Sequence, residues 1–282
     1  MIVCLGDLVE DVVVWLTAPI ATGTDTPATI TRRRGGSAAN VAAFLAHADA
    51  ESCFVGTIGT DALGDRFVEE MEDLGVTMGV HRRGRTGSIV VIVSADGERS
   101  FLTDRGSASQ VDPLTPRMLE DASWLHVPAY CLIEEPLAST ATDAFTLAKQ
   151  MDVRTSVDCS STAMLKTYGV GRFLTWLRAV APDVVFANEE EAALLGLQER
   201  WKGPGLLVVK HGPDPVEIID SSRAIVRIPV PAVRSVLDAT GAGDAFAAGF
   251  LQAFRNGVAA QEAVVAGNRL AARVLMIPGA SL

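Results

Sequence analysis

The sequence contains few cysteines, and they are not clustered. It has four, at positions 4, 53, 131 and 159, with no Cys-x-x-Cys pair. The four histidines show no metal-ligand spacing either. This pattern argues against a disulfide framework and against a zinc site, and it is typical of reduced thiols in the cytoplasm.

Long hydrophobic runs are also missing, although 49% of the 282 residues are hydrophobic. No apolar stretch reaches the roughly 18 residues of a membrane span. The first residues, Met-Ile-Val-Cys-Leu-Gly-Asp, contain neither the basic region nor the cleavage site of a secretory signal. We therefore expect a cytoplasmic protein with no membrane partner, with a sizeable core and one domain over residues 1–282.

Basic residues are outnumbered by acidic ones, 24 to 34, which gives a net charge of −10. A nucleic-acid surface would need clustered lysine and arginine, so we expect no nucleic-acid partner. The charge does not exclude a small anionic substrate, because a few local donors suffice to bind one. The phosphate-binding string Gly-x-x-x-x-Gly-Lys-Ser/Thr is absent as well.

Short apolar runs alternate with helical patterns along most of the chain, which predicts an α/β fold with a parallel sheet covered on both faces. The expected strands are 2–5, 52–55, 124–127, 155–158, 183–187 and 205–210, and the expected helices are 37–47, 62–74, 135–150, 169–178, 188–195, 245–254 and 261–276. Residue 37 is a serine and is expected to cap the first helix. A hairpin-like stretch continues from 210 to 228.

Extra strands interrupt this alternation early in the chain. Residues 12–16 and 28–33 flank a polar segment, and residues 87–94 and 99–103 bracket the turn sequence Ala-Asp-Gly-Glu. These strands, within 12–33 and 87–103, predict a small β-structure that projects from the main sheet.

The chemistry is concentrated in residues 238–250, Asp-Ala-Thr-Gly-Ala-Gly-Asp-Ala-Phe-Ala-Ala-Gly-Phe. Gly241 and Gly243 allow close approach of a ligand, and the helix that follows presents N–H groups without intrahelical acceptors. These donors and the helix dipole form an anion site. Asp244 would repel the anion but could accept a proton from a group that attacks it, as phosphoryl transfer requires. The alternative is an ordinary turn with Asp244 as a helix cap.

The string from Asp238 to Asp244 resembles the C-terminal signature of the ribokinase-like (PfkB) carbohydrate kinases. Gly35-Gly36-Ser-Ala-Ala-Asn40 resembles the family's N-terminal signature. The resemblance implies a ribokinase-like three-layer α/β/α sandwich with a mostly parallel central sheet, in which the early extra strands form a small β lid over the sugar site. Ribokinase itself has a lysine where this chain has Ser37, which removes one reason to name ribose.

The resemblance also implies roles for residues at the catalytic and substrate sites. Asp244 would be the base, and the backbone of Gly241, Ala242 and Gly243 would stabilise the transferring phosphoryl group. The residues expected to bind the acceptor are Asp11, Gly35, Gly36, Asn40 and Arg105. Asp11 follows the first strand, where open sheets bind ligands, and a solvated loop acid is the alternative. We expect Asp7 to be structural.

A third group of residues is expected to bind Mg²⁺ and ATP. Asn188-x-x-Glu191 matches the family element that holds hydrated Mg²⁺ and phosphates, although acids in a first helical turn also suit the dipole. Lys210 and Gly212 lie where the family forms its nucleotide loop, and Pro215 replaces a usual glycine there. Asn268 resembles a position that lines the adenine pocket.

We therefore expect an ATP-dependent kinase that phosphorylates a hydroxyl of a small sugar or sugar acid similar to ribose, fructose or 2-keto-3-deoxygluconate. A nucleoside kinase and a catalytically silent sugar-binding regulator are the alternatives. A dinucleotide-binding oxidoreductase would need Gly-x-Gly-x-x-Gly after the first strand, where only Gly6 is present. A homodimer through the lid and a monovalent-cation requirement are further implications of the family that the sequence leaves open.

Overall fold

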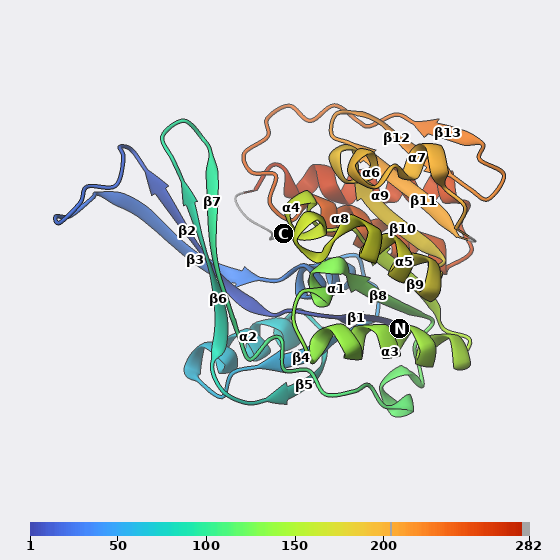
Figure 1. Cartoon of the computed structure of the whole chain (residues 1–282), viewed down its shortest axis with the longest axis horizontal. Helices are drawn as coiled ribbons and strands as arrows, with labels where there is room; N and C mark the ends of the chain where they lie inside the picture. Colours follow the sequence, from blue (N-terminus) through green and yellow to red (C-terminus); the bar gives the residue numbers. More distant parts are fainter. Residues whose placement is uncertain (204, 278–282) are drawn as a thin grey trace.

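A nine-stranded sheet forms the centre of the computed structural model, which describes residues 1–203 and 205–277 (Figure 1). The strand order is β13-β12-β11-β10-β9-β8-β1-β4-β5. The strands are β1 (Ile2–Leu5), β4 (Ser52–Ile58), β5 (Thr77–Arg82), β8 (Trp124–Pro128), β9 (Arg154–Asp158), β10 (Val184–Asn188), β11 (Leu206–His211), β12 (Asp214–Ile219) and β13 (Ile225–Ile228). Neighbours from β11 to β5 are parallel, and β12 and β13 add an antiparallel edge.

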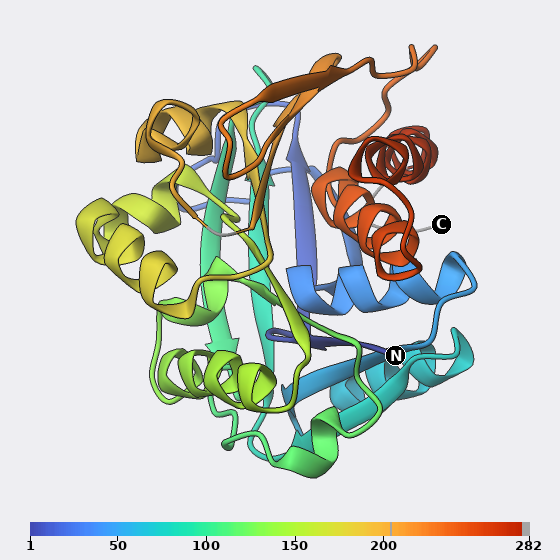
Figure 2. The same cartoon turned by 90° about the vertical axis from the view of Figure 1, so that its right-hand side faces the viewer.

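Helices cover both faces of this sheet, as Figure 2 shows. One layer contains α1 (Ser37–His47), α2 (Ala62–Asp73), α8 (Ala242–Arg255) and α9 (Ala260–Val274). The other contains α3 (Leu137–Gln150), α4 (Thr162–Tyr168), α5 (Val170–Val180) and α6 (Glu189–Leu195), with the short α7 (Leu197–Arg200) and the 3-10 turns η1 (Pro116–Leu119) and η2 (Ala129–Leu132).

The central strands are buried on both sides, which explains their unbroken apolar sequences. Successive side chains of a strand point to opposite faces. In β1, Ile2 and Cys4 therefore join the core beneath α1 and α8, whereas Val3 and Leu5 join the core beneath α3 and α5. The predicted three-layer α/β/α arrangement with a mostly parallel sheet is confirmed.

A separate four-stranded sheet projects beside the main body (Figure 1). Its strands are β2 (Val9–Leu16), β3 (Ala28–Gly35), β6 (Thr86–Val93) and β7 (Arg99–Gly106), in the order β3-β2-β6-β7. Strand β2 pairs with β3 in antiparallel and with β6 in parallel fashion, and β6 and β7 form the expected hairpin. All four expected strands are present, with partly different bounds. We call this second sheet the lid sheet, and its function as a lid stays a prediction.

The sequence patterns missed β5, α4, the short α7 and the turns η1 and η2, and they misplaced one cap. Strand β5 has no strict alternation of buried and exposed residues, and α4 is only seven residues long. The expectation that Ser37 caps α1 is wrong. The N-cap residue is Gly36, whose φ of 101° is not helical, and Ser37 is already the first residue of the helix. None of the helices in residues 1–203 and 205–277 combines the length and apolar character needed to cross a membrane.

An aromatic cluster fastens α8 to the sheet. Phe250 is fully buried, and its ring centroid lies 5.3 Å from that of Phe186 on β10 and 5.2 Å from that of Phe254. The Phe186 and Phe250 rings meet edge to face at 84°, the arrangement that aromatic quadrupoles favour. This packing fixes the position of the α8 N-terminus relative to the carboxyl ends of the strands.

Substitution of this anchor gives a test of the packing. Phe250→Ala is expected to lower the free energy of unfolding by about 3–5 kcal/mol, because a buried phenyl ring is lost and a cavity remains. The measurement is urea denaturation followed by circular dichroism. Phe101→Ala on the lid sheet is the matched control, since its side chain is 61% exposed and should change stability by less than about 0.5 kcal/mol. Equal losses in the two variants would contradict this account of the core.

Candidate active site

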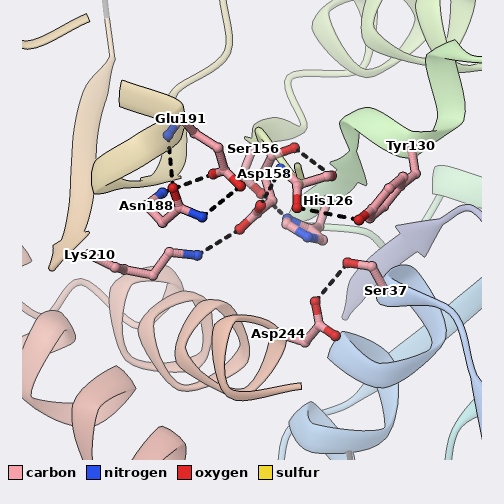
Figure 3. A network of polar contacts seen from close by, with 10 residues as sticks. Ser37, His126, Tyr130, Ser156, Asp158, Asn188, Glu191, Lys210 and Asp244 are labelled. Atoms are coloured by element: carbon pink, nitrogen blue, oxygen red, sulfur yellow. Dashed lines mark hydrogen bonds and ion pairs between the residues drawn. The ribbon is translucent and has the colours of Figure 1, made fainter. Parts of the chain in front are cut away.

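The N-terminus of α8 meets the N-terminus of α1 at the carboxyl end of the sheet. Asp244 of α8 accepts a hydrogen bond from Ser37 Oγ at 2.7 Å and one from Asn40 Nδ2 at 2.9 Å. These partners lie 207 and 204 positions away in the chain. The two glycine-containing motifs therefore form one site, and the Ser37 hydroxyl, which the sequence suggested as a cap, holds the Asp244 carboxylate instead (Figure 3).

The backbone before Asp244 has the geometry of an anion-binding turn. Gly241 caps α8 in the left-handed region, with φ 77° and ψ −3°, where a residue with a Cβ is disfavoured. The first N–H groups of a helix lack partners four residues back, which applies to Gly243 and Asp244. Ala242, expected to offer a third donor, instead donates its N–H to the Ala239 carbonyl at 3.2 Å.

The protein environment weakens the acidity of Asp244. Burial raises the pKa of its carboxyl to about 6, with a further contribution from Asp158, while the hydrogen bonds from Ser37 and Asn40 and the charge of Lys210 oppose the rise. A carboxylate with a raised pKa is a stronger base than an ordinary aspartate and still loses its proton below neutral pH. Asp244 is therefore suited to accept a proton from a hydroxyl group.

Asn188 and Glu191 form a reciprocal cap on α6. Asn188 Oδ1 accepts from the Glu191 N–H at 2.8 Å, while the Glu191 carboxylate accepts from the Asn188 N–H and Nδ2, both at 2.9 Å. Glu191 is buried, which together with Asp158 raises its pKa. The helix cap and the expected ligand role therefore fall on the same two residues.

A hydrated Mg²⁺ is compatible with this region. No group of three or more His, Cys, Asp or Glu side chains in residues 1–203 and 205–277 is arranged to hold a metal ion directly. Mg²⁺ usually keeps several waters and binds through one or two carboxylates and substrate phosphates. Glu191, Asp158 and Asp244 concentrate negative charge in one place, which suits such a water-mediated site.

Lys210 carries a positive charge into this acidic region. Its Nζ lies 3.0 Å from Asp158 Oδ2. Burial lowers the pKa of the ammonium. The charges of Asp158, Glu191 and Asp244 raise it by more than burial lowers it, so the pKa lies above its usual value. Asp158 was missed in the sequence, although it ends a predicted strand at the same sheet edge as the other site residues. Its position at the end of that strand was the sequence signal from which a role in the site could have been predicted.

The expected acceptor-binding glycines pack against protein atoms. A Cβ on Gly35 would come within 2.3 Å of Asp11 Cγ, and one on Gly36 within 2.1 Å of the Asp7 carbonyl oxygen. Close packing against Asp11 and Asp7 is therefore sufficient to explain why both positions need a residue without a side chain, with no ligand involved. Asp11 lies on the lid sheet opposite Arg33, and burial raises the pKa of its carboxyl to about 6 against the opposing charges of Arg33 and Arg34. Binding of substrate by Asp11, Gly35 and Gly36 stays a prediction.

Arg105 is engaged by protein carboxylates. It pairs with Asp7, and its Nε lies 3.7 Å from Glu134. The Arg105 and Asp7 side chains are both buried, so the pair fixes β7 against the segment that follows β1. This contact agrees with the structural role expected of Asp7. It also occupies Arg105, which we expected to bind the acceptor.

Two lid arginines contact the segment before α8. Arg33 Nη1 lies 3.9 Å and Arg99 Nη2 lies 3.5 Å from the carboxylate of Asp238. Asp238 Oδ1 also accepts from the N–H and the hydroxyl of Thr240. Strands β3 and β7 are thereby linked to the turn that leads into Gly241.

The remaining expected nucleotide residues lie in other local settings. Gly212 is in the tight turn between β11 and β12 with φ 60°, and Pro215 lies in β12. Asn268 is buried on α9, where its Nδ2 lies 3.4 Å from the Pro229 carbonyl oxygen. The structure connects neither Gly212 nor Asn268 by a hydrogen bond to the Asp244 site within the described residues.

Known proteins are similar to this chain in sequence and in fold. Residues 1–282 match the model of the pfkB family of carbohydrate kinases. An ATP-dependent ribose-1-phosphate kinase of Halopiger xanaduensis is 32% identical over 77% of this chain and 72% of the relative. A fructokinase of Klebsiella pneumoniae is 31% identical over 77% of this chain and 75% of the relative.

Solved structures give the same fold. Adenosine kinase from Sinorhizobium meliloti superposes with a TM-score of 0.86 at 24% identity and covers 100% of this chain and 95% of its own. Ribokinase from Thermotoga maritima does so with a TM-score of 0.79 at 22% identity, covering 99% and 94%. The predicted ribokinase-like fold is thus confirmed, and the chain belongs to the pfkB family of carbohydrate kinases.

Proposed function

We propose that the protein transfers the γ-phosphoryl group of ATP to a hydroxyl of a small sugar, with Asp244 as the catalytic base. The observation that carries the proposal is the position of Asp244. Its carboxylate is fixed by Ser37 and Asn40 at the N-terminus of a helix that begins after a left-handed glycine. A base beside anion-binding N–H groups is the arrangement that phosphoryl transfer to an alcohol requires.

In the proposed step, Asp244 accepts the proton of the acceptor hydroxyl as its oxygen attacks the γ-phosphorus. The N–H groups of Gly243 and Asp244 stabilise charge on the phosphoryl oxygens. The expected donor groups at Gly241 and Ala242 border the same site, and the Ala242 N–H would have to leave the Ala239 carbonyl to take part. Water exclusion by the lid sheet would limit hydrolysis of ATP.

Mg²⁺ and nucleotide would be held at the acidic end of the site. Glu191 and Asn188 would bind the ion through water, and the ion would supply positive charge to the phosphates. Lys210 on β11, Gly212 in the turn after β11 and Asn268 on α9 are proposed to border the nucleotide. ATP- and ADP-bound structures are known for a fructokinase from Xylella fastidiosa and a ribokinase from Cryptococcus neoformans with the same fold. A monovalent-cation requirement stays a prediction.

For the acceptor we propose a free sugar or sugar acid similar to ribose, fructose or 2-keto-3-deoxygluconate, bound by Asp11, Asn40, Gly35 and Gly36. A nucleoside is the second candidate, because an aminoimidazole riboside kinase of Salmonella typhimurium is 25% identical over 77% of this chain. A silent regulator is less well supported, since Asp244 and Gly243 are both in place. Four buried free cysteines support the cytoplasmic location that we propose.

The direct test is ADP release from Mg-ATP with a panel of acceptors: ribose, ribose 1-phosphate, fructose, 2-keto-3-deoxygluconate and adenosine. We expect turnover with one class of acceptor. ATP binding without turnover on any sugar or nucleoside would favour the regulator, and absence of ATP binding would overturn the kinase assignment.

The role of Asp244 predicts a specific mutant. In Asp244→Asn the amide oxygen can still accept from Asn40 and the new NH₂ group can donate to the Ser37 hydroxyl, so the side chain stays in place. The amide cannot, however, accept the proton. We expect kcat to fall by roughly 10²–10⁴-fold, the usual contribution of a general base, while calorimetry shows ATP affinity close to wild type. Asp143→Asn, at an exposed position of α3, is the control and should retain full activity. Wild-type turnover in Asp244→Asn would exclude it as the base.

The raised pKa of Asp244 predicts an acid limb in the pH profile. Only the carboxylate form accepts a proton, and the pKa is about 6, so kcat/KM should fall tenfold per pH unit below about 6 and level off above it. An ordinary aspartate would place this limb near pH 4. Initial rates between pH 4.5 and about 8 with saturating Mg-ATP would distinguish the two positions.

We further propose a homodimer through the outer face of the lid sheet. Directly paired residues in neighbouring strands share a face, so the registers place Asp11, Arg33, Phe101 and Arg99 on the face toward Asp238. By the same registers, Val12, Val14, Ile30 and Leu102 lie on the opposite face. Ile30 and Leu102 on this outer face are 56% and 59% exposed.

Neighbouring positions on the two faces give a matched pair of variants. Leu102→Glu should convert the dimer to a monomer in sedimentation velocity experiments, because it places a charge in an apolar interface. Phe101→Glu, equally exposed but on the inner face, should leave the dimer intact. A monomeric wild-type protein, or dissociation of Phe101→Glu alone, would contradict the proposed interface.

A further inference from the structure

Lys210 and Asp158 form an ion pair that the reaction above does not explain. The side chains are 17% and 11% exposed, and Lys210 Nζ lies 3.0 Å from Asp158 Oδ2. In the parallel registers, Asp158 pairs with Phe186, and Lys210 pairs with Asn188. Residues 186 and 188 share one face of β10, so both charged side chains lie on the face that packs against α8. Since β10 lies between β9 and β11, the Lys210 ammonium reaches Asp158 over the end of β10, on the face of the sheet that packs against α8.

The ammonium lies beside the proposed anion site. A Cβ on Gly243 would come within 3.3 Å of Lys210 Nζ, and the ring of Phe246, one turn into α8, has its centroid 6.0 Å from the same atom. The Gly243 N–H, at the start of the helix, has no hydrogen-bond partner within residues 1–203 and 205–277. An anion held by this N–H group would consequently lie next to a full positive charge.

Lys210 has donors to spare. An ammonium group has three N–H donors, and within residues 1–203 and 205–277 Asp158 is its one hydrogen-bond partner. The position of Asp158 is fixed independently, because its Oδ1 accepts from the Ser160 N–H at 2.8 Å. Ser160 adopts a left-handed φ of 69° to make this contact. A rigid carboxylate thus holds one proton of the ammonium and leaves two for another ligand.

We propose that Lys210 is a further catalytic residue of the kinase reaction, which donates to the oxygens of the phosphoryl group in transit, and that Asp158 is the positioning residue that holds its ammonium beside Gly243. The inference rests on the proposed function. In the step, the acceptor oxygen bonds to the γ-phosphorus and the bond to the bridging oxygen breaks. ADP keeps that electron pair, and Asp244 takes the hydroxyl proton. Lys210 keeps its protons and offsets charge on the phosphoryl oxygens.

The proposal predicts different effects on ADP and on an ATP analogue. Lys210→Met removes the charge at similar length, so affinity for Mg-AMP-PNP should fall while affinity for Mg-ADP, which lacks the γ-phosphate, stays unchanged in calorimetry. With the acceptor found in the panel, kcat should fall by roughly 10²–10³-fold, as for loss of one oxyanion-hole donor, and the KM of the acceptor should change little. Lys149→Met, at an exposed position of α3, is the control.

Two more variants separate this role from a structural one. Lys210→Met leaves Asp158 buried without its cation, so Lys210→Met combined with Asp158→Asn should recover thermal stability but not kcat. Asp158→Asn alone should lower kcat less than Lys210→Met, because the ammonium remains but is less well placed. Recovery of kcat in the double variant would overturn the proposal.

The outcomes also separate this inference from the kinase assignment. Wild-type kcat in Lys210→Met, or equal losses of ADP and AMP-PNP affinity, would exclude contact with the transferring group while leaving the kinase function intact. A wild-type protein that binds neither nucleotide would overturn both.

Discussion

The concentration of like charge at one edge of the sheet is the constraint on which the site depends. The charge of Asp158 raises the pKa values of Glu191 and Asp244, and the charges of all three carboxylates raise the pKa of Lys210. Carboxylates brought together away from water repel, and this repulsion disfavours folding unless donors and cations offset it. Here Ser37, Asn40, Asn188 and Ser160 supply hydrogen bonds, and Lys210 supplies the charge. The contacts that stabilise this polar network are therefore the same contacts that would position the proposed catalytic groups.

Close packing behind the network gives these polar contacts their precision. A Cβ on Gly249 of α8 would come within 2.8 Å of the Ala266 carbonyl oxygen, and one on Gly267 of α9 within 2.8 Å of the Phe246 carbonyl oxygen. These two glycines allow α8 and α9 to approach closely, and Phe250 packs α8 against Phe186 of β10. Since interiors of this density tolerate little movement, Asp244 and Gly243 are held where Ser37 and Lys210 can meet them.

The lid sheet is coupled to the same helix through electrostatics. Arg33 and Arg99 reach Asp238 from two strands, and Arg105 fixes β7 to Asp7 beyond the end of β1. Surface ion pairs contribute little to stability, but the contacts of Arg33 and Arg99 are made to a buried carboxylate, Asp238, in the segment before Gly241. Any displacement of the lid sheet would therefore act directly on the segment that leads into the proposed anion site.

Much of this protein could be predicted from the sequence because the signals are local. The apolar runs, the glycine at 241 and the Asp that follows act within a few residues, so the three-layer fold, the helix N-terminus and the candidate base could be named in advance. The tertiary structure alone decided which side chains meet: Ser37 with Asp244, Lys210 with Asp158, and Arg105 with Asp7. Each pair joins segments at least 52 positions apart. Strand order and register bring such segments together, and no local pattern encodes that choice.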